Sequence, residues 1–144
     1  MMEAATKGAR DAGGLSVGIV PSEDAAQANE FCDFVIATGL GMSRDFVVAY
    51  SGDAMVVVGG GGGTLIETAA AYQASKPIVA VKGTGGVADA WAGRYIDDRR
   101  TKMILGASSP EDAVKTAMRE LSRRGKNPSK AEAKRPPRHA RRTS

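Results

Sequence analysis

The sequence contains very little histidine, cysteine or aromatic side chain. Its 144 residues include one histidine and one cysteine, and aromatic residues make up 5%. The single cysteine, Cys32, excludes an internal disulfide and a cluster of several thiolates within one chain, and we expect a buried, unreactive thiol. Because His139 lies near the carboxyl end, we expect neither Ser-His-Asp or Cys-His catalysis nor a metal site in the body of the protein. Acid–base chemistry, if present, then falls to carboxylates.

Long apolar runs are also lacking. No stretch approaches the roughly 20 residues of a membrane span, and the first residues lack the basic and apolar regions of a signal peptide. We therefore expect a cytoplasmic protein with no membrane partner. A chain of 144 residues, 42% hydrophobic and 25% charged, suits one globular domain.

The positive charge is concentrated at the carboxyl end. Residues 123–144 hold nine of the 20 basic residues and one acid, Glu132, with almost nothing apolar. Such a segment cannot offset its own ordering entropy, so we expect a disordered basic tail after a domain spanning 1–122. The tail could contact nucleic acid non-specifically through phosphates. It has no aromatic side chain for base stacking, and charge runs of this kind are more often solvated interaction tails.

Short apolar segments alternate with helical segments in the rest of the chain. The expected strands are 15–20, 34–38, 54–59, 77–82 and 102–105, and the expected helices are 2–12, 43–50, 64–74, 87–95 and 110–122. Ser109 and Pro110 are typical of a helix cap and first helical position. Continuous apolar strands that alternate with helices predict an α/β fold, with a parallel sheet covered on both faces.

The glycine run 59–63 is the most informative local feature. It follows the apolar stretch 54–58 and precedes Thr64-Leu65-Ile66-Glu67, which predicts a strand, a glycine turn and the start of a helix. Outward-pointing amides and the helix dipole make such a turn a seat for phosphate. A flexible connection is the alternative, because the run matches neither G-x-G-x-x-G nor a P-loop. Glycine-bearing loops 38–41 and 83–86 also follow strands, and we expect all three at the carboxyl edge of the sheet.

Two charged residues are candidates for chemistry near these loops. Glu67 follows Thr64 by three residues, so it fits either a capping box or a functional carboxylate. Arg44 places a cation in the first turn of a helix, where the dipole disfavours it. A bound anion would remove that conflict, and a salt bridge with Asp45 or Asp53 is the alternative.

The stretch from Gly60 to Glu67 resembles the P-G-G-x-G-T-x-x-E motif of the Lonely Guy (LOG) superfamily, with Gly59 in place of the proline. Segments 2–5, 13–21 and 38–44 are similar to the second helix, the third strand and the arginine segment of that superfamily. The wording of the motif, with glycine in place of that proline, most closely resembles the branch of molybdenum-cofactor carrier proteins. The resemblance implies a Rossmann-like, doubly wound, three-layer α/β/α fold, usually as a homodimer.

The resemblance also implies a site for a small phosphorylated ligand. The residues that it places around the ligand are Gly39, Gly41, Gly60, Gly61, Gly62, Gly63 and Thr64. Arg44 and Glu67 correspond to the residues that support hydrolysis of a nucleoside 5′-monophosphate to free base and ribose 5-phosphate, in which a carboxylate stabilises an oxocarbenium-like ribose. In the carrier branch the same cleft is thought to hold a phosphorylated pterin, the molybdenum cofactor, without turnover. We favour binding over hydrolysis, with no cofactor required.

Two departures from the superfamily pattern bear on this expectation. Asp45 stands where the hydrolytic branch has lysine, which reverses the local charge and weighs against hydrolysis. Superfamily members also have about 35 further residues before the segment that resembles 2–5, the size of a strand–helix–strand unit. We expect this amino-terminal unit to be missing here, which would expose a sheet edge.

Overall fold

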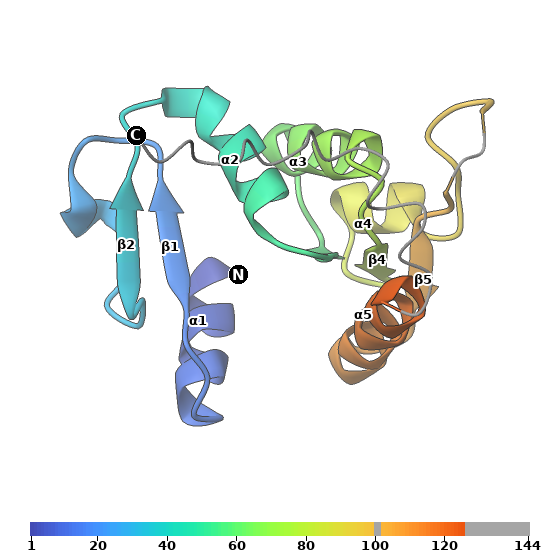
Figure 1. Cartoon of the computed structure of the whole chain (residues 1–144), viewed down its shortest axis with the longest axis horizontal. Coiled ribbons are helices and arrows are strands. Elements are labelled where there is room, and N and C mark those ends of the chain that lie inside the picture. Colours follow the sequence, from blue (N-terminus) through green and yellow to red (C-terminus); the bar gives the residue numbers. More distant parts are fainter. Residues whose placement is uncertain (100–101, 126–144) are drawn as a thin grey trace, which may run out of the picture.

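The structure is a computed structural model that describes residues 1–99 and 102–125. Helices and strands alternate along the chain (Figure 1). The elements are α1 (Met2–Asp11), β1 (Val17–Val20), β2 (Phe34–Ala37), α2 (Arg44–Ser51), β3 (Met55–Val58), α3 (Gly62–Gln73), β4 (Ile78–Val81), α4 (Gly86–Trp91), β5 (Leu105–Ala107) and α5 (Pro110–Gly125), with short 3₁₀ turns at Ala25–Gln27 and Gly41–Ser43. The predicted α/β class is confirmed, and every described strand pair is parallel.

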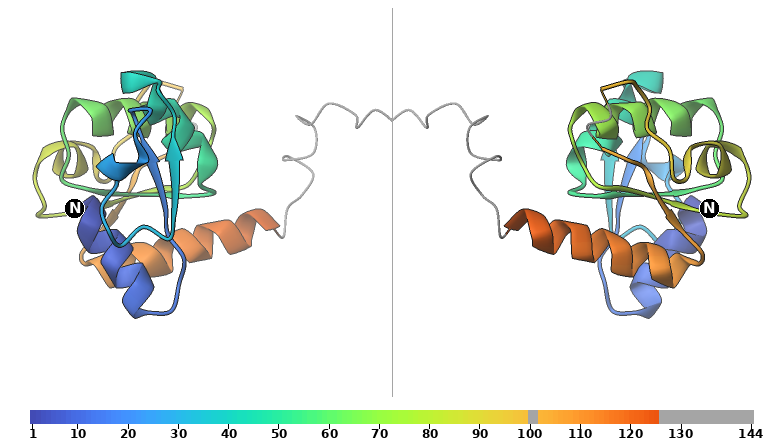
Figure 2. Two further views of the ribbon diagram at one scale, coloured as in Figure 1. Left: turned by 90° about the vertical axis from the view of Figure 1, so that its left-hand side faces the viewer. Right: turned by 90° about the vertical axis from the view of Figure 1, so that its right-hand side faces the viewer.

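The core lies around β4, the middle strand of a sheet with the order β3-β4-β5. All four residues of β4 are buried. Ile78 and Ala80 pack into a cluster that includes residues of α3 and α4, whereas Val79 and Val81 pack against residues of α5. Figure 2 shows α5 and α3 on opposite sides of this sheet. The predicted three-layer arrangement is therefore confirmed for β3-β4-β5, and the unbroken apolar sequence of β4 follows from its two covered faces.

The other two strands form a separate sheet rather than extending the first one. Within the described residues β1 pairs with β2 alone, with Val17 beside Phe34 and Val20 beside Ala37. α2 contacts both β1 and α3, so it links the two sheets (Figure 1). α1 lies next to β1 in this view and has no buried residue. The expected single sheet is thus replaced by two sheets joined through helices.

α3 and β5 begin at other residues than expected, because of particular backbone hydrogen bonds. α3 begins at Gly62, not Thr64, because the Leu65 amide already donates to the Gly61 carbonyl at 3.0 Å. β5 covers 105–107 rather than 102–105, because Ile104 forms an antiparallel bridge with Arg94 before the parallel pairing begins.

The last helices also differ from expectation. α4 ends at Trp91, and Gly93 at φ 77° turns the chain away. α5 begins at Pro110 as predicted, and the Ser109 hydroxyl accepts the Asp112 amide at 3.1 Å. The helix continues to Gly125, so 123–125 belong to the folded body. The rest of the expected tail lies outside the described residues. Among the described helices, none is long and apolar enough to cross a membrane.

Candidate functional site

The glycine motif connects β3 to α3 in an unusually crowded turn. Gly59 and Gly60 have φ angles of 59° and 99°, a region that side-chain-bearing residues rarely adopt. A Cβ on Gly60 would come within 2.5 Å of the Thr64 side chain. The motif therefore needs glycine at Gly60 for a conformational and a steric reason.

The loop at 83–86 holds this turn in place. The Gly59 amide donates to the Thr84 hydroxyl at 2.8 Å, and the Gly59 and Gly60 carbonyls accept the Ala88 and Val87 amides, each at 3.0 Å. Gly86 approaches so closely that a Cβ there would lie 2.1 Å from the Gly60 oxygen. The loop at 83–86 thus packs against the glycine motif and helps to hold its backbone in place.

The amides in the first turn of α3 form the part of the motif that faces solvent. Gly61 is the N-cap and no side chain caps the helix, so the N–H groups of Gly61, Gly62, Gly63 and Thr64 have no partner within the helix. Gly61 and Gly62 are exposed, and a Cβ on either would meet open space. A Cβ on Gly63 would instead lie 3.3 Å from the Asp45 carboxylate. Gly61 and Gly62 therefore have open space beside them, whereas Asp45 lies beside Gly63.

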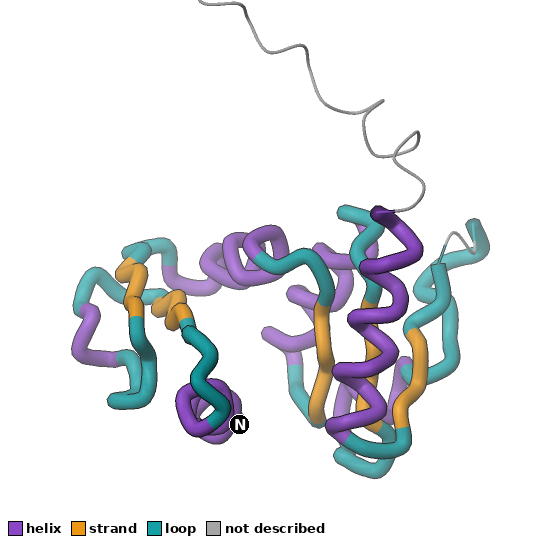
Figure 3. The backbone as a smooth tube through the Cα atoms, turned by 60° about the horizontal axis from the view of Figure 1, so that its bottom comes forward, coloured by secondary structure: helices purple, strands orange, loops and turns teal. Residues whose placement is uncertain are grey.

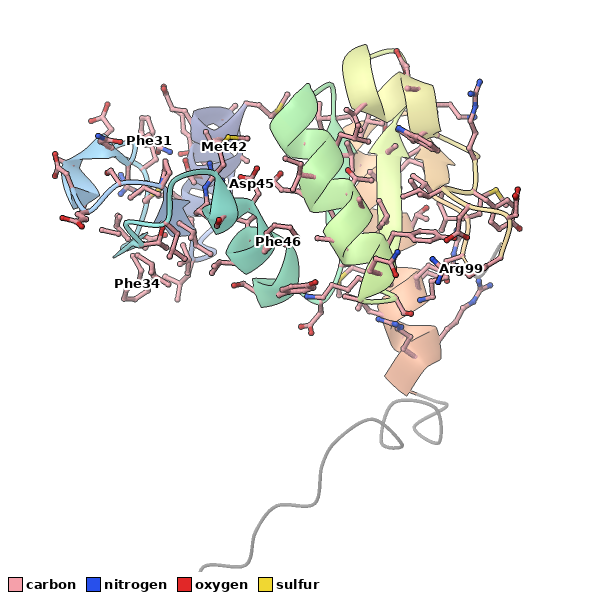
Figure 4. The ribbon with its side chains drawn as sticks, turned by 90° about the horizontal axis from the view of Figure 1, so that it is seen from above. Phe31, Phe34, Met42, Asp45, Phe46 and Arg99 are labelled. Carbon is pink, nitrogen blue, oxygen red and sulfur yellow. The ribbon has the colours of Figure 1, made fainter. Side chains whose placement is uncertain are left out.

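Asp45 occupies the side of the turn that faces α2. This residue is 6% exposed, and Figure 4 shows its side chain between α2 and α3. A carboxylate beside the start of α3 interacts favourably with the helix dipole. Asp45 thus supplies a resident negative charge close to the expected phosphate seat.

Arg44 joins this carboxylate to Glu67. Its Nη1 atom lies 3.6 Å from Asp45 Oδ1 and 3.4 Å from Glu67 Oε1. The salt-bridge alternative for Arg44 is thus realised with Asp45, and Glu67 is a second partner. The Nε atom of Arg44 is the one buried side-chain nitrogen or oxygen without a hydrogen-bond partner in the described part of the chain. A buried guanidinium nitrogen without a partner is costly, so Arg44 retains an unused donor.

The capping-box alternative for Glu67 is not realised. Because α3 begins at Gly62, Glu67 lies in its second turn, where its carboxylate accepts a hydrogen bond from Arg44 at 3.4 Å. Burial raises the pKa of Glu67 above its usual value, and the neighbouring Asp45 raises it further, while Arg44 opposes the shift. The arrangement therefore favours a protonated Glu67 more than an isolated carboxyl group would.

A cavity of about 560 Å³ opens beside these charged residues. Its lining includes Arg44 and Glu67 together with Val48 of α2, β1 and part of α1. Cys32 also lines it and is half-buried rather than fully buried. The glycine motif is not among the residues that line the cavity, whereas Arg44, which contacts Asp45 at 3.6 Å, is one of them.

The loop at 38–41 leads through a 3₁₀ turn to Arg44 at the start of α2, and its glycine amides are not open. The Gly39 amide donates to Ser22 at 3.1 Å and the Gly41 amide donates to Pro21 at 2.9 Å. Both glycines have positive φ angles. Gly39 and Gly41 therefore shape the chain that leads into α2, while their amides are already engaged.

Some contributors to the site were not predicted from the sequence. Thr84 and Asp89 stabilise the glycine loops: the Asp89 carboxylate accepts the amides of Gly83 and Gly85 at 2.6 and 2.8 Å. The sequence signal that could have predicted this role is the position of Asp89 a few residues after Gly83 and Gly85, because aspartate side chains often accept hydrogen bonds from nearby backbone amides. No group of three or more His, Cys, Asp or Glu residues suited to a metal occurs within 1–99 and 102–125.

The chain belongs to the SLOG cluster4 family, whose model matches residues 1–114. This assignment agrees with the resemblance to the LOG superfamily. Over 82 residues the chain is also 42% identical to an uncharacterized protein of Archaeoglobus fulgidus; the match covers 57% of this chain and 54% of that protein. The chain thus spans about half the length of this relative.

Three solved structures share the fold. The crystal structure of TM1055 has a TM-score of 0.75 and 38% identity, covering 82% of this chain and 72% of the other. The molybdenum cofactor binding protein of Rippkaea orientalis has a TM-score of 0.71 and 30% identity, with coverages of 83% and 71%. The molybdenum cofactor carrier protein of Chlamydomonas reinhardtii has a TM-score of 0.67 and 32% identity, with coverages of 84% and 70%. These likenesses establish a Rossmann-like fold of the kind found in molybdenum cofactor carriers.

Proposed function

We propose that this protein binds a phosphorylated cofactor of the molybdenum-cofactor type and does not transform it. The single observation that carries the proposal is the half-buried Arg44 side chain, whose buried Nε has no hydrogen-bond partner and which lines a cavity large enough for a small molecule. Two similar structures are proteins that bind or carry this cofactor. The proposal combines that likeness with the local chemistry of Arg44.

The ligand phosphate would lie against the exposed amides of Gly61 and Gly62, with Gly63 and Thr64 completing the first turn of α3. Gly60 would shape the turn rather than contact the ligand, because the Thr64 side chain occupies the space where a Gly60 Cβ would lie. A helix start binds phosphate through free amides and the helix dipole. Arg44 would supply the counter-charge, and the rest of the ligand would extend into the cavity that Arg44 and Glu67 line.

The charge of the site favours binding without turnover. When both are ionised, Asp45 and Glu67 carry two negative charges against the one positive charge of Arg44. The arrival of a negatively charged phosphate therefore favours protonation of Glu67. A protonated Glu67 can donate a hydrogen bond to the ligand. It would not stabilise a positively charged ribose as a carboxylate would.

Loading with the cofactor tests this proposal. Purified protein is mixed anaerobically with molybdenum cofactor, and protein-bound molybdenum is measured after gel filtration. Arg44→Ala should bind about 10- to 150-fold more weakly, because a hydrogen bond to a charged group contributes about 1.5–3 kcal/mol. Arg119→Ala, which removes the same charge from the exposed surface of α5, is the matched control. Equal loading of all three proteins would contradict the role of Arg44.

Hydrolysis of a nucleoside 5′-monophosphate is the second candidate, because Arg44 and Glu67 lie in contact at 3.4 Å. It is tested with a panel of these nucleotides, by measuring free base and ribose 5-phosphate. Release that depends on both Arg44 and Glu67 would favour the hydrolase. Cofactor binding with no release would favour the carrier.

A further inference from the structure

Two cationic side chains converge on one backbone oxygen at the end of α3. The Nζ atom of Lys102 donates to the Ser75 carbonyl at 2.5 Å, and the Arg124 guanidinium donates to the same oxygen. The two charged groups therefore lie within about 5 Å of each other, because each is within hydrogen-bonding distance of a single atom. One donor satisfies a carbonyl at a helix end, so capping of α3 does not explain the second cation.

The backbone that carries this oxygen is held in an uncommon conformation. Ser75 is the one described residue other than glycine with a positive φ angle, 57°, a region that residues with a side chain rarely adopt. Its amide donates to the Tyr72 carbonyl at 2.9 Å and so ties the turn to α3. The Ser75 carbonyl is thereby fixed in place, and Lys102 and Arg124 are held together beside it. Uncommon backbone conformations of this kind often occur at binding sites.

Acidic side chains do not neutralise the two cations. Among the described residues, no salt bridge joins Lys102 or Arg124 to an acid. The one acidic residue that lines the cavity beside them is Glu120. Its carboxylate already accepts a hydrogen bond from Arg123 at 2.8 Å. Three positive charges therefore face one negative charge, which leaves a net charge of +2 at this place.

A cavity of about 160 Å³ opens beside Lys102 and Arg124. Its remaining walls are formed by Glu120 and by four largely apolar side chains, which are Pro77, Ile78, Met103 and Leu105. One water molecule takes up about 30 Å³ of liquid, so the cavity can hold a small ion with a few water molecules. Apolar walls beside charged groups strengthen the local field, because they have a low dielectric constant. The cavity is therefore suited to a small anion.

This cavity lies at the amino-terminal edge of the sheet, opposite the glycine motif. β4 begins at Ile78, which lines the cavity, and ends at Val81, and the loop at 83–86 that contacts the glycine motif follows Val81. In Figure 3, α5 runs alongside the strands and its last turn lies at one end of them. The cavity shares no lining residue with the cavity beside Arg44. The two sites are therefore separated by the length of β4.

The protonation of Lys102 reflects the shortage of negative charge around it. Burial lowers the pKa of Lys102 below its ordinary value, and the neighbouring Arg124 lowers it further, while Glu120 opposes the shift. An anion bound between the two cations would favour the protonated form of Lys102, because opposite charges stabilise each other.

We propose that Lys102 and Arg124 form a second anion site, which binds one phosphate group, either as inorganic phosphate or as part of a small phosphomonoester. The Arg124 guanidinium can bind two phosphate oxygens through parallel N–H groups, and Lys102 supplies a compact positive charge. A phosphate dianion matches the net charge of +2 around the cavity, whereas a carboxylate carries half of the required charge. The proposal does not depend on which ligand the Arg44 site binds.

An amide NMR titration of the full chain with inorganic phosphate tests this site. Phosphate is added at constant ionic strength, and chloride at the same ionic strength is the reference. Saturable shift changes are expected at the amides of Lys102, Met103 and Arg124 with phosphate and not with chloride. A parallel titration with glycerol 3-phosphate identifies the source of the phosphate group. Tighter binding of the ester would assign the site to a phosphomonoester, and tighter binding of the free ion would assign it to inorganic phosphate.

Matched variants separate the site from general attraction of anions to a basic protein. Lys102→Met and Arg124→Gln should each weaken phosphate binding by at least about tenfold, because each removes a hydrogen bond between charged groups. Lys115→Met and Arg119→Gln remove the same charges from exposed positions of α5 and should leave the binding unchanged. Every variant retains residues 126–144, so the basic residues there contribute equally to all measurements.

Two further measurements keep the test independent of folding and of the Arg44 site. If the Lys102→Met variant unfolds, the side-chain resonances of Lys102 in the unaltered protein are followed against pH. The pKa of Lys102 should rise when phosphate is added, and that of Lys115 should not. Lys102→Arg should retain phosphate binding. Arg44→Ala should also retain the shift changes at Lys102 and Arg124, so this site can be judged whether or not the Arg44 site binds a cofactor.

Two results would overturn the proposal. Shift changes that grow linearly with phosphate and equal those in chloride would show screening of charge without a site. Saturable phosphate binding that persists undiminished in folded Lys102→Met and Arg124→Gln would place the anion elsewhere on the protein.

Discussion

Replacement of Gly86 by alanine should destabilise the fold far more than the same change at Gly83. Both glycines have positive φ angles, 53° and 79°, so alanine at either position costs about 1–2 kcal/mol in backbone strain. A Cβ on Gly83 meets nothing within 4 Å, whereas a Cβ on Gly86 would lie 2.1 Å from the Gly60 oxygen. Only Gly86→Ala must therefore push the two glycine loops apart.

The magnitude follows from the bonds between these loops. Separation breaks the bonds from Val87 and Ala88 to the Gly60 and Gly59 carbonyls, each contributing about 0.5–1.5 kcal/mol. Together with the strain, Gly86→Ala should cost about 2–5 kcal/mol. Urea unfolding measures the difference, and with m values of about 1–3 kcal/mol per molar its midpoint should fall well below that of Gly83→Ala. Equal midpoints for the two variants would refute the loop contact on which the site geometry depends.

Three further predictions concern the site and its surroundings. Gly62→Ala should keep or raise stability by up to about 1 kcal/mol, because alanine favours helix, yet weaken cofactor loading by blocking an open amide; unchanged loading would exclude this position from the phosphate seat. The pKa of Glu67 is raised in the folded chain, so as the pH rises above 4.5 the folded chain keeps a proton that the unfolded chain has released. The contribution of Glu67 to the free energy of unfolding should therefore fall as the pH rises from 4.5 to the raised pKa of the folded chain. Thermal melts of Glu67→Gln across this pH range should lack that fall. Lys76→Ala should lower stability by about 1 kcal/mol in urea unfolding, because Lys76 donates to the Tyr50 and Gly52 carbonyls at the end of α2.

Local sequence patterns predicted most of the described elements. The apolar run Met55–Val58 and the glycines after it specified a strand and a tight turn, because burial and positive φ each demand particular residue types. The start of α3 was less predictable, since glycine carries no side-chain cap to mark it. Thr64 therefore looked like a helix start although it lies in the third helical position.

The interactions around Arg44 were only partly predictable. Its proximity to Asp45 follows from the sequence, but the contact with Glu67 depends on how α2 packs on α3. The same packing brings Asp45 against Gly63, which no local pattern indicates. The division into two sheets also depends on long-range pairing, since the strand sequences themselves are those of covered strands.

The most direct test of the central claim is an amide NMR titration of ¹⁵N-labelled protein with molybdenum cofactor. The account predicts that the largest shift changes occur at Gly61 and Gly62, with smaller changes at Gly39 and Gly41, whose amides are already bonded within the chain. It also predicts that Arg44→Ala removes these changes at the same cofactor concentration. Saturable binding that leaves the amides of the α3 first turn unmoved would contradict the claim that this turn and Arg44 hold the ligand phosphate.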